Sequence, residues 1–326
     1  MRATGPVRMG VLGCADIAVR RVLPAIAAVP GVEAAVVASR DRSTAERVAA
    51  ANGAAAVTGY DAVLHRQDVD AVYVPLPTAL HAEWVERALL AGKHVLSEKP
   101  LSTHGARTTA LVRLAATRGL VLRENFMFPF HSQHRRVLDL VEAGAIGELR
   151  SLNAVFSVPP RPDADIRYRP DLGGGSLLDL GVYPLRAAQL LLGNELDVLG
   201  ATLARDTRRG VDLGGAALLR SSEDVFVQVT FGMRNFYRAS YELCGSEGRI
   251  TVERAYAPPA DLRPDVRVER ERGVEQMAWP PDDQYTAAMR GFADAVRSPA
   301  SRTDDPLSHP AVVLGTLVDD VLRKAG

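Results

Sequence analysis

A short apolar segment followed by a turn of small residues constrains the fold of this chain more than any other feature. Residues 7–13 have the composition of a buried strand, and Gly13, Ala15 and Ala18 match the G-x-G-x-x-G pattern with alanine at its second and third glycine positions. Small residues there allow the backbone to approach a pyrophosphate and the next helix to pack on the strand. An apolar-periodic helix, which contains Pro24, and a second strand at residues 32–39 follow.

This β–α–β pattern predicts a dinucleotide-binding turn, and the alternative is a tight turn that binds no ligand. Because a proline interrupts the helix, we expect a late helix start or a kink. The residues expected to bind the cofactor at the turn are Gly13, Cys14, Ala15, Asp16 and Ile17.

The end of the second strand indicates which dinucleotide is bound. Ser39 and Arg40 stand there, with Asp41 one residue later. Arginine makes bidentate bonds to phosphate, and Ser39 can donate to the same group, so this pair favours the 2′-phosphate of NADP. In the alternative interpretation Arg40 is a solvated loop residue and Asp41 binds the ribose of NAD.

Three later strand ends extend the predicted cofactor site. Residues 94–97 form a buried strand that leads into Glu98, Lys99 and Pro100, and this places a cation at the carboxyl edge of a sheet, where ligands bind in open α/β folds. Residues 71–77 and 120–126 form the neighbouring strands. His81 lies in the first turn of the helix that follows residues 71–77. A single histidine at such a place is more often structural than catalytic, so we treat His81 as a cofactor contact. The further cofactor contacts expected are Leu76, Pro77, His81, Glu98, Lys99 and Asn125.

A glycine-rich segment at residues 173–183 forms a second group of candidate residues. Asp179 and Tyr183 are four residues apart, so a helix that begins near the glycines presents both on one face. We expect Lys99, Asp179 and Tyr183 to be the catalytic residues. In the preceding irregular segment, Arg161, Arg167 and Arg169 either bind a diphosphate or are ordinary surface charges.

The length of 326 residues favours two domains. We expect a dinucleotide-binding domain at residues 1–126 and a domain for substrate binding and oligomerisation at residues 127–326. Alternating apolar positions beyond residue 196 predict an antiparallel sheet. One face of that sheet needs cover, and the other is expected to pair with a second subunit in a homodimer or homotetramer.

Composition excludes several classes of function. The 39 basic and 39 acidic residues give a formal net charge of zero, which argues against a nucleic-acid partner. Two cysteines suggest no disulfide framework and fit a reducing cytoplasm. No run approaches the ~18 apolar residues of a membrane span. We expect no metal site.

Several of these motifs resemble one known family. Pro77 with His81, residues 91–95, residues 98–100 and residues 173–183 are similar to the glucose–fructose oxidoreductase and inositol dehydrogenase (Gfo/Idh/MocA) family. The resemblance implies an α/β fold with an N-terminal Rossmann domain, a doubly wound parallel sheet, and a C-terminal α+β domain with a large open, mainly antiparallel sheet. It also implies that Lys99 and Tyr183 lie near a nicotinamide and that the Lys99–Pro100 peptide can be cis.

Within this family the chain most resembles NADP-dependent 3-ketoreductases. Inositol dehydrogenases carry histidine where this chain has Tyr183, whereas residues 14–18, 21–25 and 124–128 are similar to enzymes that act on TDP-3-keto-6-deoxyhexoses in deoxysugar biosynthesis. The resemblance therefore implies NADPH-dependent reduction of a keto group on a nucleotide-linked sugar. The alternatives are an NADP-dependent dehydrogenase of a free sugar, cyclitol or dihydrodiol, and a non-catalytic NADP-binding regulator.

Such a reaction gives the candidate residues complementary roles. When hydride reaches the carbonyl carbon, the oxygen becomes an alkoxide that must be protonated or neutralised. Lys99 can supply positive charge and Tyr183 can donate a proton. Asp179 is expected to orient Lys99 or a substrate hydroxyl.

Overall fold

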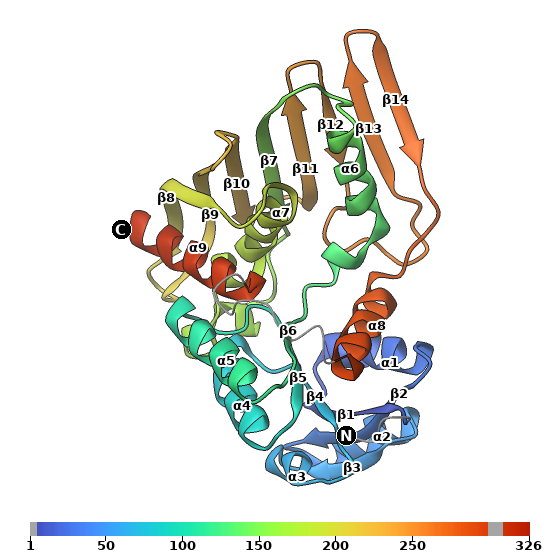
Figure 1. Ribbon diagram of the computed structural model, residues 1–326. Coiled ribbons are helices and arrows are strands. Elements are labelled where there is room, and N and C mark those ends of the chain that lie inside the picture. Colours follow the sequence, from blue (N-terminus) through green and yellow to red (C-terminus); the bar gives the residue numbers. More distant parts are fainter. Residues whose placement is uncertain (1–4, 299–308) are drawn as a thin grey trace. The chain divides into compact units, whose positions relative to one another are not determined.

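The computed structural model describes residues 5–298 and 309–326, which form two compact units (Figure 1). The first unit contains the residues up to Phe126 together with Tyr285–Val312, and the second contains Met127–Gln284 and Val313–Gly326. The chain therefore leaves the first unit after Phe126 and returns to it at helix α8 (Gln284–Arg297).

Helix α8 groups with the first unit because its apolar face packs into that unit's core. Met289, Phe292, Ala293 and Val296 are buried there among residues of the first strand and the first helix. The spacing of these four residues predicts a helix but does not say which sheet the helix covers.

The first unit is built on a six-stranded sheet with the strand order β3-β2-β1-β4-β5-β6. All neighbouring strands run parallel, which is the doubly wound arrangement that the first half of the chain predicts. Its strands are β1 (Val7–Leu12), β2 (Val32–Ser39), β3 (Ala55–Thr58), β4 (Ala71–Val74), β5 (His94–Ser97) and β6 (Leu122–Glu124).

Helices cover both faces of this sheet. One apolar core contains residues of α1 (Leu23–Ala28), α2 (Arg42–Ala51) and α8, and the other contains residues of α3 (Asp61–Leu64), α4 (Thr78–Leu90) and α5 (Gly105–Thr117). Burial on both faces explains why β1 and β4 consist mostly of apolar residues.

The helix after β1 is irregular just before Pro24. Asp16 and Ile17 are already helical, a π-helical turn, Ala18–Val22, follows, and α1 begins at Leu23 with Pro24 as its second residue. The helix therefore does not start late. Its α-helical pattern is interrupted next to Pro24, which has no amide to donate to a carbonyl of the preceding turn.

The second unit contains an eight-stranded sheet with the order β14-β13-β12-β11-β7-β10-β9-β8. Its strands pair antiparallel except for β7 and β10, which run parallel. This confirms the predicted fold class. The strands are β7 (Leu149–Ser157), β8 (Leu196–Asp206), β9 (Val211–Ser221), β10 (Phe226–Gly232), β11 (Arg238–Gly245), β12 (Gly248–Val252), β13 (Asp265–Arg270) and β14 (Gly273–Ala278).

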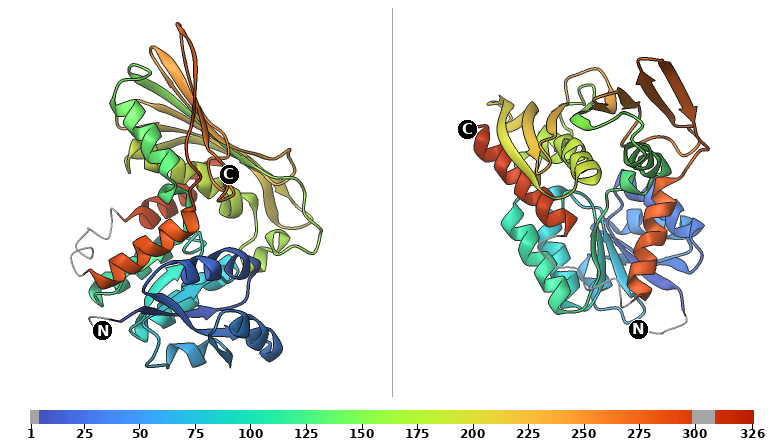
Figure 2. Two further views of the ribbon diagram at one scale, coloured as in Figure 1. Left: turned by 90° about the vertical axis from the view of Figure 1, so that its right-hand side faces the viewer. Right: turned by 45° about the horizontal axis from the view of Figure 1, so that its top comes forward.

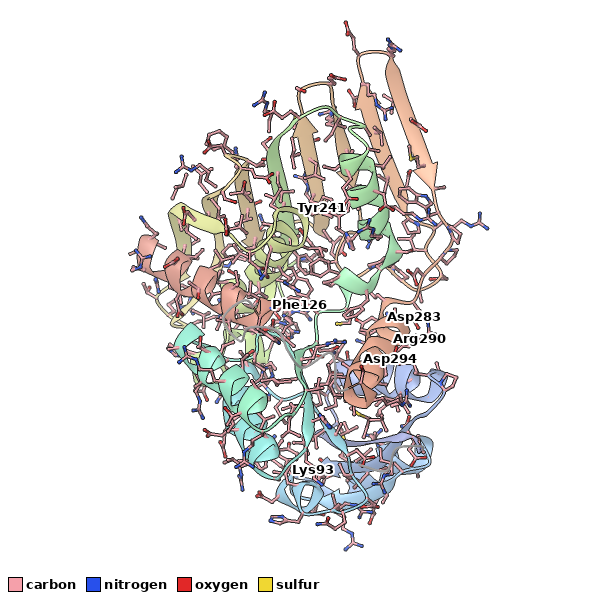
Figure 3. The ribbon with its side chains drawn as sticks, viewed as in Figure 1. Lys93, Phe126, Tyr241, Asp283, Arg290 and Asp294 are labelled. Atoms are coloured by element: carbon pink, nitrogen blue, oxygen red, sulfur yellow. The ribbon has the colours of Figure 1, made fainter. Side chains whose placement is uncertain are left out.

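Helices α6 (Ser132–Glu142) and α7 (Val182–Leu192) lie on one face of this sheet (Figure 2). Under α6, Tyr241 of β11 is buried with its hydroxyl 2.9 Å from Nδ1 of His134 (Figure 3). On β10, Val227 and Val229 are buried under this cover, whereas Phe226 on the opposite face is 52% exposed. Helix α9 (Pro310–Lys324) ends the chain. Among the described residues, no helix is long and apolar enough to cross a membrane.

Candidate active site

The turn after β1 places Gly13, which has no side chain, at the carboxyl edge of the first sheet. Gly13 has φ +121°, and a Cβ added there would lie 3.1 Å from Cδ2 of Leu76. Glycine is therefore required both by the backbone conformation and by the close approach of the loop after β4. Asp16 is exposed and pairs with Arg20, so its carboxylate points to its own helix.

Cys14 is half buried beside this turn. Burial raises the pKa of its thiol, while the positive charge of Arg47 on α2 acts in the opposite direction. Arg47 was not among the predicted site residues. Its position on α2, eight residues beyond the strand end, carries no sequence signal, and only the packing of α2 brings its charge near the turn.

The two candidate contacts at the ribose end of the cofactor, Arg40 and Asp41, follow β2 directly. Asp41 caps α2, because its carboxylate accepts hydrogen bonds of 2.7 Å from the Thr44 amide and from the Ser43 hydroxyl. These bonds lower the pKa of Asp41. Both bonds go to Oδ1, so the carboxylate that the NAD alternative requires is directed toward the start of α2.

Arg40 is exposed, as Asp41 is, and lies near the hydroxyl of Tyr60. Burial raises the pKa of Tyr60, and Arg40 partly offsets this effect. The Tyr60 hydroxyl also lies 3.7 Å from the position of a Cβ on Gly13. Tyr60 is thus a second residue at this edge that sequence reasoning missed.

Glu98 belongs to a buried hydrogen-bond network at the ends of three neighbouring strands. Its Oε1 accepts bonds of 2.7 Å from the Tyr73 hydroxyl and from Nδ2 of Asn125. Burial, followed by the charge of Glu98, raises the pKa of Tyr73 well above its usual value. Glu98 and Asn125 were predicted as cofactor contacts, and the structure directs both side chains toward each other.

The segment around Lys99 is held on both sides. The Lys99–Pro100 peptide is cis, as the resemblance implied. The Glu98 amide donates to the Val74 carbonyl, and the Leu101 amide donates to Oε1 of Glu124 at 2.6 Å. Lys99 itself is partly exposed between these anchored residues.

His81, which was predicted as a cofactor contact, is 1% exposed. Its Nδ1 lies 2.7 Å from the Pro100 carbonyl and its Nε2 lies 2.7 Å from the Leu76 carbonyl. Burial lowers the pKa of this imidazole, while both carbonyl oxygens act in the opposite direction. Both ring nitrogens are therefore occupied by the backbone, whereas Leu76 and Pro77 remain partly exposed at the same edge.

In the second unit a π-helical turn, Leu177–Gly181, leads into α7 and carries Asp179 at its start. The helix thus begins near the glycines, as expected. Asp212 of β9 holds the first residues of the turn, because its Oδ2 accepts bonds from the Ser176 hydroxyl at 2.5 Å and from the Leu177 amide at 2.7 Å. Gly175, with φ +116°, leaves room for this carboxylate, since a Cβ there would lie 2.5 Å from Oδ1 of Asp212.

Asp179 forms an ion pair with Arg167, whose Nε lies 2.6 Å from Oδ2 of Asp179. Arg167 also contacts Asp165 at 3.2 Å. Burial lowers the pKa of Arg167, but the two carboxylates outweigh this effect and raise it. The sequence offered no reason to connect Arg167 with Asp179.

The other two arginines of this segment are also paired. Arg169 contacts Asp171 at 2.5 Å, and Arg161 lies 3.9 Å from Asp165. These pairings favour the interpretation of the three arginines as locally neutralised charges over a diphosphate site.

Tyr183 lies one residue into α7 and is partly exposed. Its ring centroid is 5.0 Å from that of Phe156, 5.7 Å from that of Tyr256 and 6.1 Å from that of Phe128. Three aromatic neighbours thus restrict the orientation of the phenol ring. In the described part of the chain, no group of three or more His, Cys, Asp or Glu side chains is arranged to hold a metal ion.

The chain is similar in sequence and fold to known oxidoreductases. Residues 7–126 match a family model described as an oxidoreductase family with an NAD-binding Rossmann fold, and residues 134–251 match the Gfo/Idh/MocA C-terminal domain. The chain is 59% identical over 292 residues to dTDP-3,4-didehydro-2,6-dideoxy-α-D-glucose 3-reductase of Streptomyces violaceoruber, covering 89% of this chain and 85% of the relative. It is 36% identical over 293 residues to D-xylose 1-dehydrogenase (NADP(+)) 2 of Haloferax volcanii, covering 89% of both chains.

Among solved structures, the chain is similar to KijD10, a 3-ketoreductase from Actinomadura kijaniata in complex with NADP and TDP-benzene. The TM-score is 0.94 at 48% identity, and the match covers 98% of both chains.

Proposed function

The chain belongs to the Gfo/Idh/MocA family of oxidoreductases, and on this basis we propose that it is an NADPH-dependent reductase of the 3-keto group of a dTDP-linked 3,4-didehydro-2,6-dideoxyhexose. The observation that carries the proposal is the 59% identity with a 3-reductase of that name across 89% of this chain. Three further reductases of the same name are 49–50% identical over more than nine tenths of the chain.

NADP fits the residues at the carboxyl edge of the first sheet. The turn at Gly13 provides backbone that can approach a pyrophosphate. Asp41 caps α2, and its neighbours Ser39 and Arg40 at the end of β2 carry a hydroxyl and a guanidinium that suit a 2′-phosphate. Leu76 and Pro77 line the adjacent loop and would contact the cofactor from there.

The catalytic step assigns one role to each unit. NADPH supplies a hydride to the carbonyl carbon. Lys99 provides positive charge to the oxygen that becomes an alkoxide, and Tyr183 provides a proton. The preorganised surroundings of both residues support these roles, because Lys99 lies between anchored residues and the Tyr183 ring is packed among three aromatic rings.

Solved variants of the related 3-ketoreductase support the same two residues. Its structures include substitutions of one lysine and of one tyrosine, which are separated by as many residues as Lys99 and Tyr183 are. For Asp179 we propose a positioning role, in which it orients Lys99 or a substrate hydroxyl; the ion pair with Arg167 restricts the orientation of its carboxylate.

The test is a comparison of two reactions with one enzyme preparation. We expect NADPH consumption with the dTDP-linked 3,4-didehydro sugar and no NADP⁺ reduction with D-xylose. The second candidate function, oxidation of a free sugar, has the 36% identity with a D-xylose dehydrogenase in its favour and predicts the reverse result. NADP binding without turnover of either substrate would indicate a regulator.

We also propose that the protein is a homodimer or homotetramer in the cytoplasm. Phe226 and Leu218 are 52% and 40% exposed on the face of the second sheet opposite α6 and α7, and apolar residues gathered on such a face indicate an association surface. Both cysteines are free, which fits a reducing compartment. Phe226→Glu should lower the sedimentation coefficient to that of a monomer. A monomeric wild-type protein at micromolar concentration would contradict the oligomer.

A further inference from the structure

His81 connects two loops of the candidate site through the two nitrogens of one ring. It lies on α4, and its nitrogens are each 2.7 Å from a carbonyl oxygen, that of Leu76 after β4 and that of Pro100 after Lys99. The side chain is 1% exposed, so water cannot replace either contact without a rearrangement. Leu76 also forms the wall next to Gly13.

This geometry restricts the protonation state of the ring. A neutral imidazole carries one N–H and one lone pair, whereas an imidazolium carries two N–H groups. A carbonyl oxygen is only an acceptor, and 2.7 Å is at the short limit of N–H···O hydrogen bonds. A neutral His81 would therefore place a nitrogen lone pair against a carbonyl oxygen at hydrogen-bond distance. Only the imidazolium makes two attractive contacts.

Burial opposes a charged ring and lowers the pKa of His81, so the case for the cation is geometric and rests on the two carbonyl contacts. Those two carbonyl oxygens and the carboxylate of Glu98 act against the effect of burial, whereas Lys99 adds to it. Glu98 is itself held by Tyr73 and Asn125. On the neighbouring elements, Glu124 of β6 accepts from the Leu101 amide, and Arg107 of α5 is paired with Glu86 of α4. Glu98 is thus the negative charge that favours a protonated His81 ring.

We propose that His81 is a positioning residue that donates from an imidazolium to the Leu76 and Pro100 carbonyls and thereby fixes the backbone that carries Lys99. The inference rests on the proposed function only through the role of Lys99. Glu98, Pro100 and Leu101 are then each held by a hydrogen bond. When the ring loses a proton, one carbonyl loses its donor, and the segment around Lys99 loosens.

The protonation state is measured directly by NMR of ring-labelled histidines in the full chain, with the His81 signals identified by their loss in His81→Gln. We expect both ring nitrogens to be protonated at about pH 5–6, with loss of one proton at higher pH. In the same pH range, hydrogen exchange of the Leu101 amide should accelerate. A ring that is neutral from about pH 5 to 8, or exchange that does not follow its titration, would overturn the proposal. Neither the His81 titration nor the exchange of the Leu101 amide depends on turnover. A failure of this proposal can therefore be told apart from a failure of the proposed function.

Variants test the link to Lys99. His81→Phe removes both donors and should lower kcat by roughly tenfold to a hundredfold, because a small misplacement of a catalytic group has effects of that size. His81→Gln supplies amide donors that do not titrate, so it should retain more activity and lose the part of the kcat–pH profile that follows the ring. His65→Gln, at an exposed histidine of the same unit, is the matched control and should behave as wild type. Native kcat in a folded His81→Phe protein, or an unchanged pH profile in His81→Gln, would refute the positioning role.

Discussion

Replacing Asp212 with alanine should destabilise the second unit and disturb the turn that leads to Tyr183. The carboxylate accepts two hydrogen bonds, of 2.5 Å from the Ser176 hydroxyl and 2.7 Å from the Leu177 amide. Both donors belong to residues that are at most 1% exposed. Hydrogen bonds to a charged group contribute about 1.5–3 kcal/mol each, and a buried donor left without a partner costs about 1–3 kcal/mol.

The two bonds share one carboxylate oxygen, so their contributions are not additive. We therefore expect Asp212→Ala to lower the free energy of unfolding of the second unit by about 3 kcal/mol. Asp212→Asn keeps one acceptor and the same shape, so its effect should be smaller. In both variants kcat should fall, because the helix that carries Tyr183 begins at this turn.

The two tryptophans allow this effect to be assigned to one unit. Trp84 lies in the first unit and Trp279 in the second. In a Trp84→Phe background, fluorescence during urea unfolding reports on the second unit, where Trp279 stacks with Arg136. A loss below about 1 kcal/mol in Asp212→Ala, or a loss equal to that of Asp212→Asn, would refute the reasoning. A native kcat would show that the turn does not position Tyr183.

Three further predictions concern the cofactor, the catalytic pair and pH. Arg40→Ala should raise the KM for NADPH roughly tenfold, as expected for loss of a charged contact, with kcat little changed; equal efficiency of the wild-type enzyme with NADH would contradict it. Lys99→Ala and Tyr183→Phe should each slow single-turnover hydride transfer by a factor within the ~10²–10⁴ that one proton-transfer group contributes to the rate, while the affinity for NADPH is retained. The rate of the double variant should fall by less than the product of the two single factors. Fully multiplicative losses would place the two residues in separate steps. Burial lowers the pKa of His134 to about 3, so the unfolded state takes up this proton first as pH falls, and the free energy of unfolding should decrease below about pH 6.5 by up to about 5 kcal/mol. His134→Gln should remove this part of the pH dependence in urea titrations, and an unchanged slope would contradict the prediction.

Local patterns in the sequence predicted most strands of the first unit, though not β3 or the packing of α8. Parallel strands buried on both faces are continuous apolar runs, and each strand end carries polar residues, so β1, β2, β4 and β5 are visible without a structure. Proline acts on its own backbone, so an irregular helix around Pro24 could also be predicted from that residue alone. These features depend on residues that are close in the sequence, and for that reason they could be predicted.

The partners of the polar side chains were decided by tertiary structure. Asp41 and Arg40 are adjacent, yet Asp41 caps α2 and Arg40 stays exposed. Arg167 and Asp179 are 12 residues apart, and Asp212 reaches Ser176 across 36.

A sequence motif names the residues that a site needs but not the hydrogen bonds that hold them, because those bonds form between segments that only packing brings together. His81 is the plainest case. Its position in the first turn of α4 marks it as part of the site, and only the fold places its two nitrogens against the carbonyls of Leu76 and Pro100.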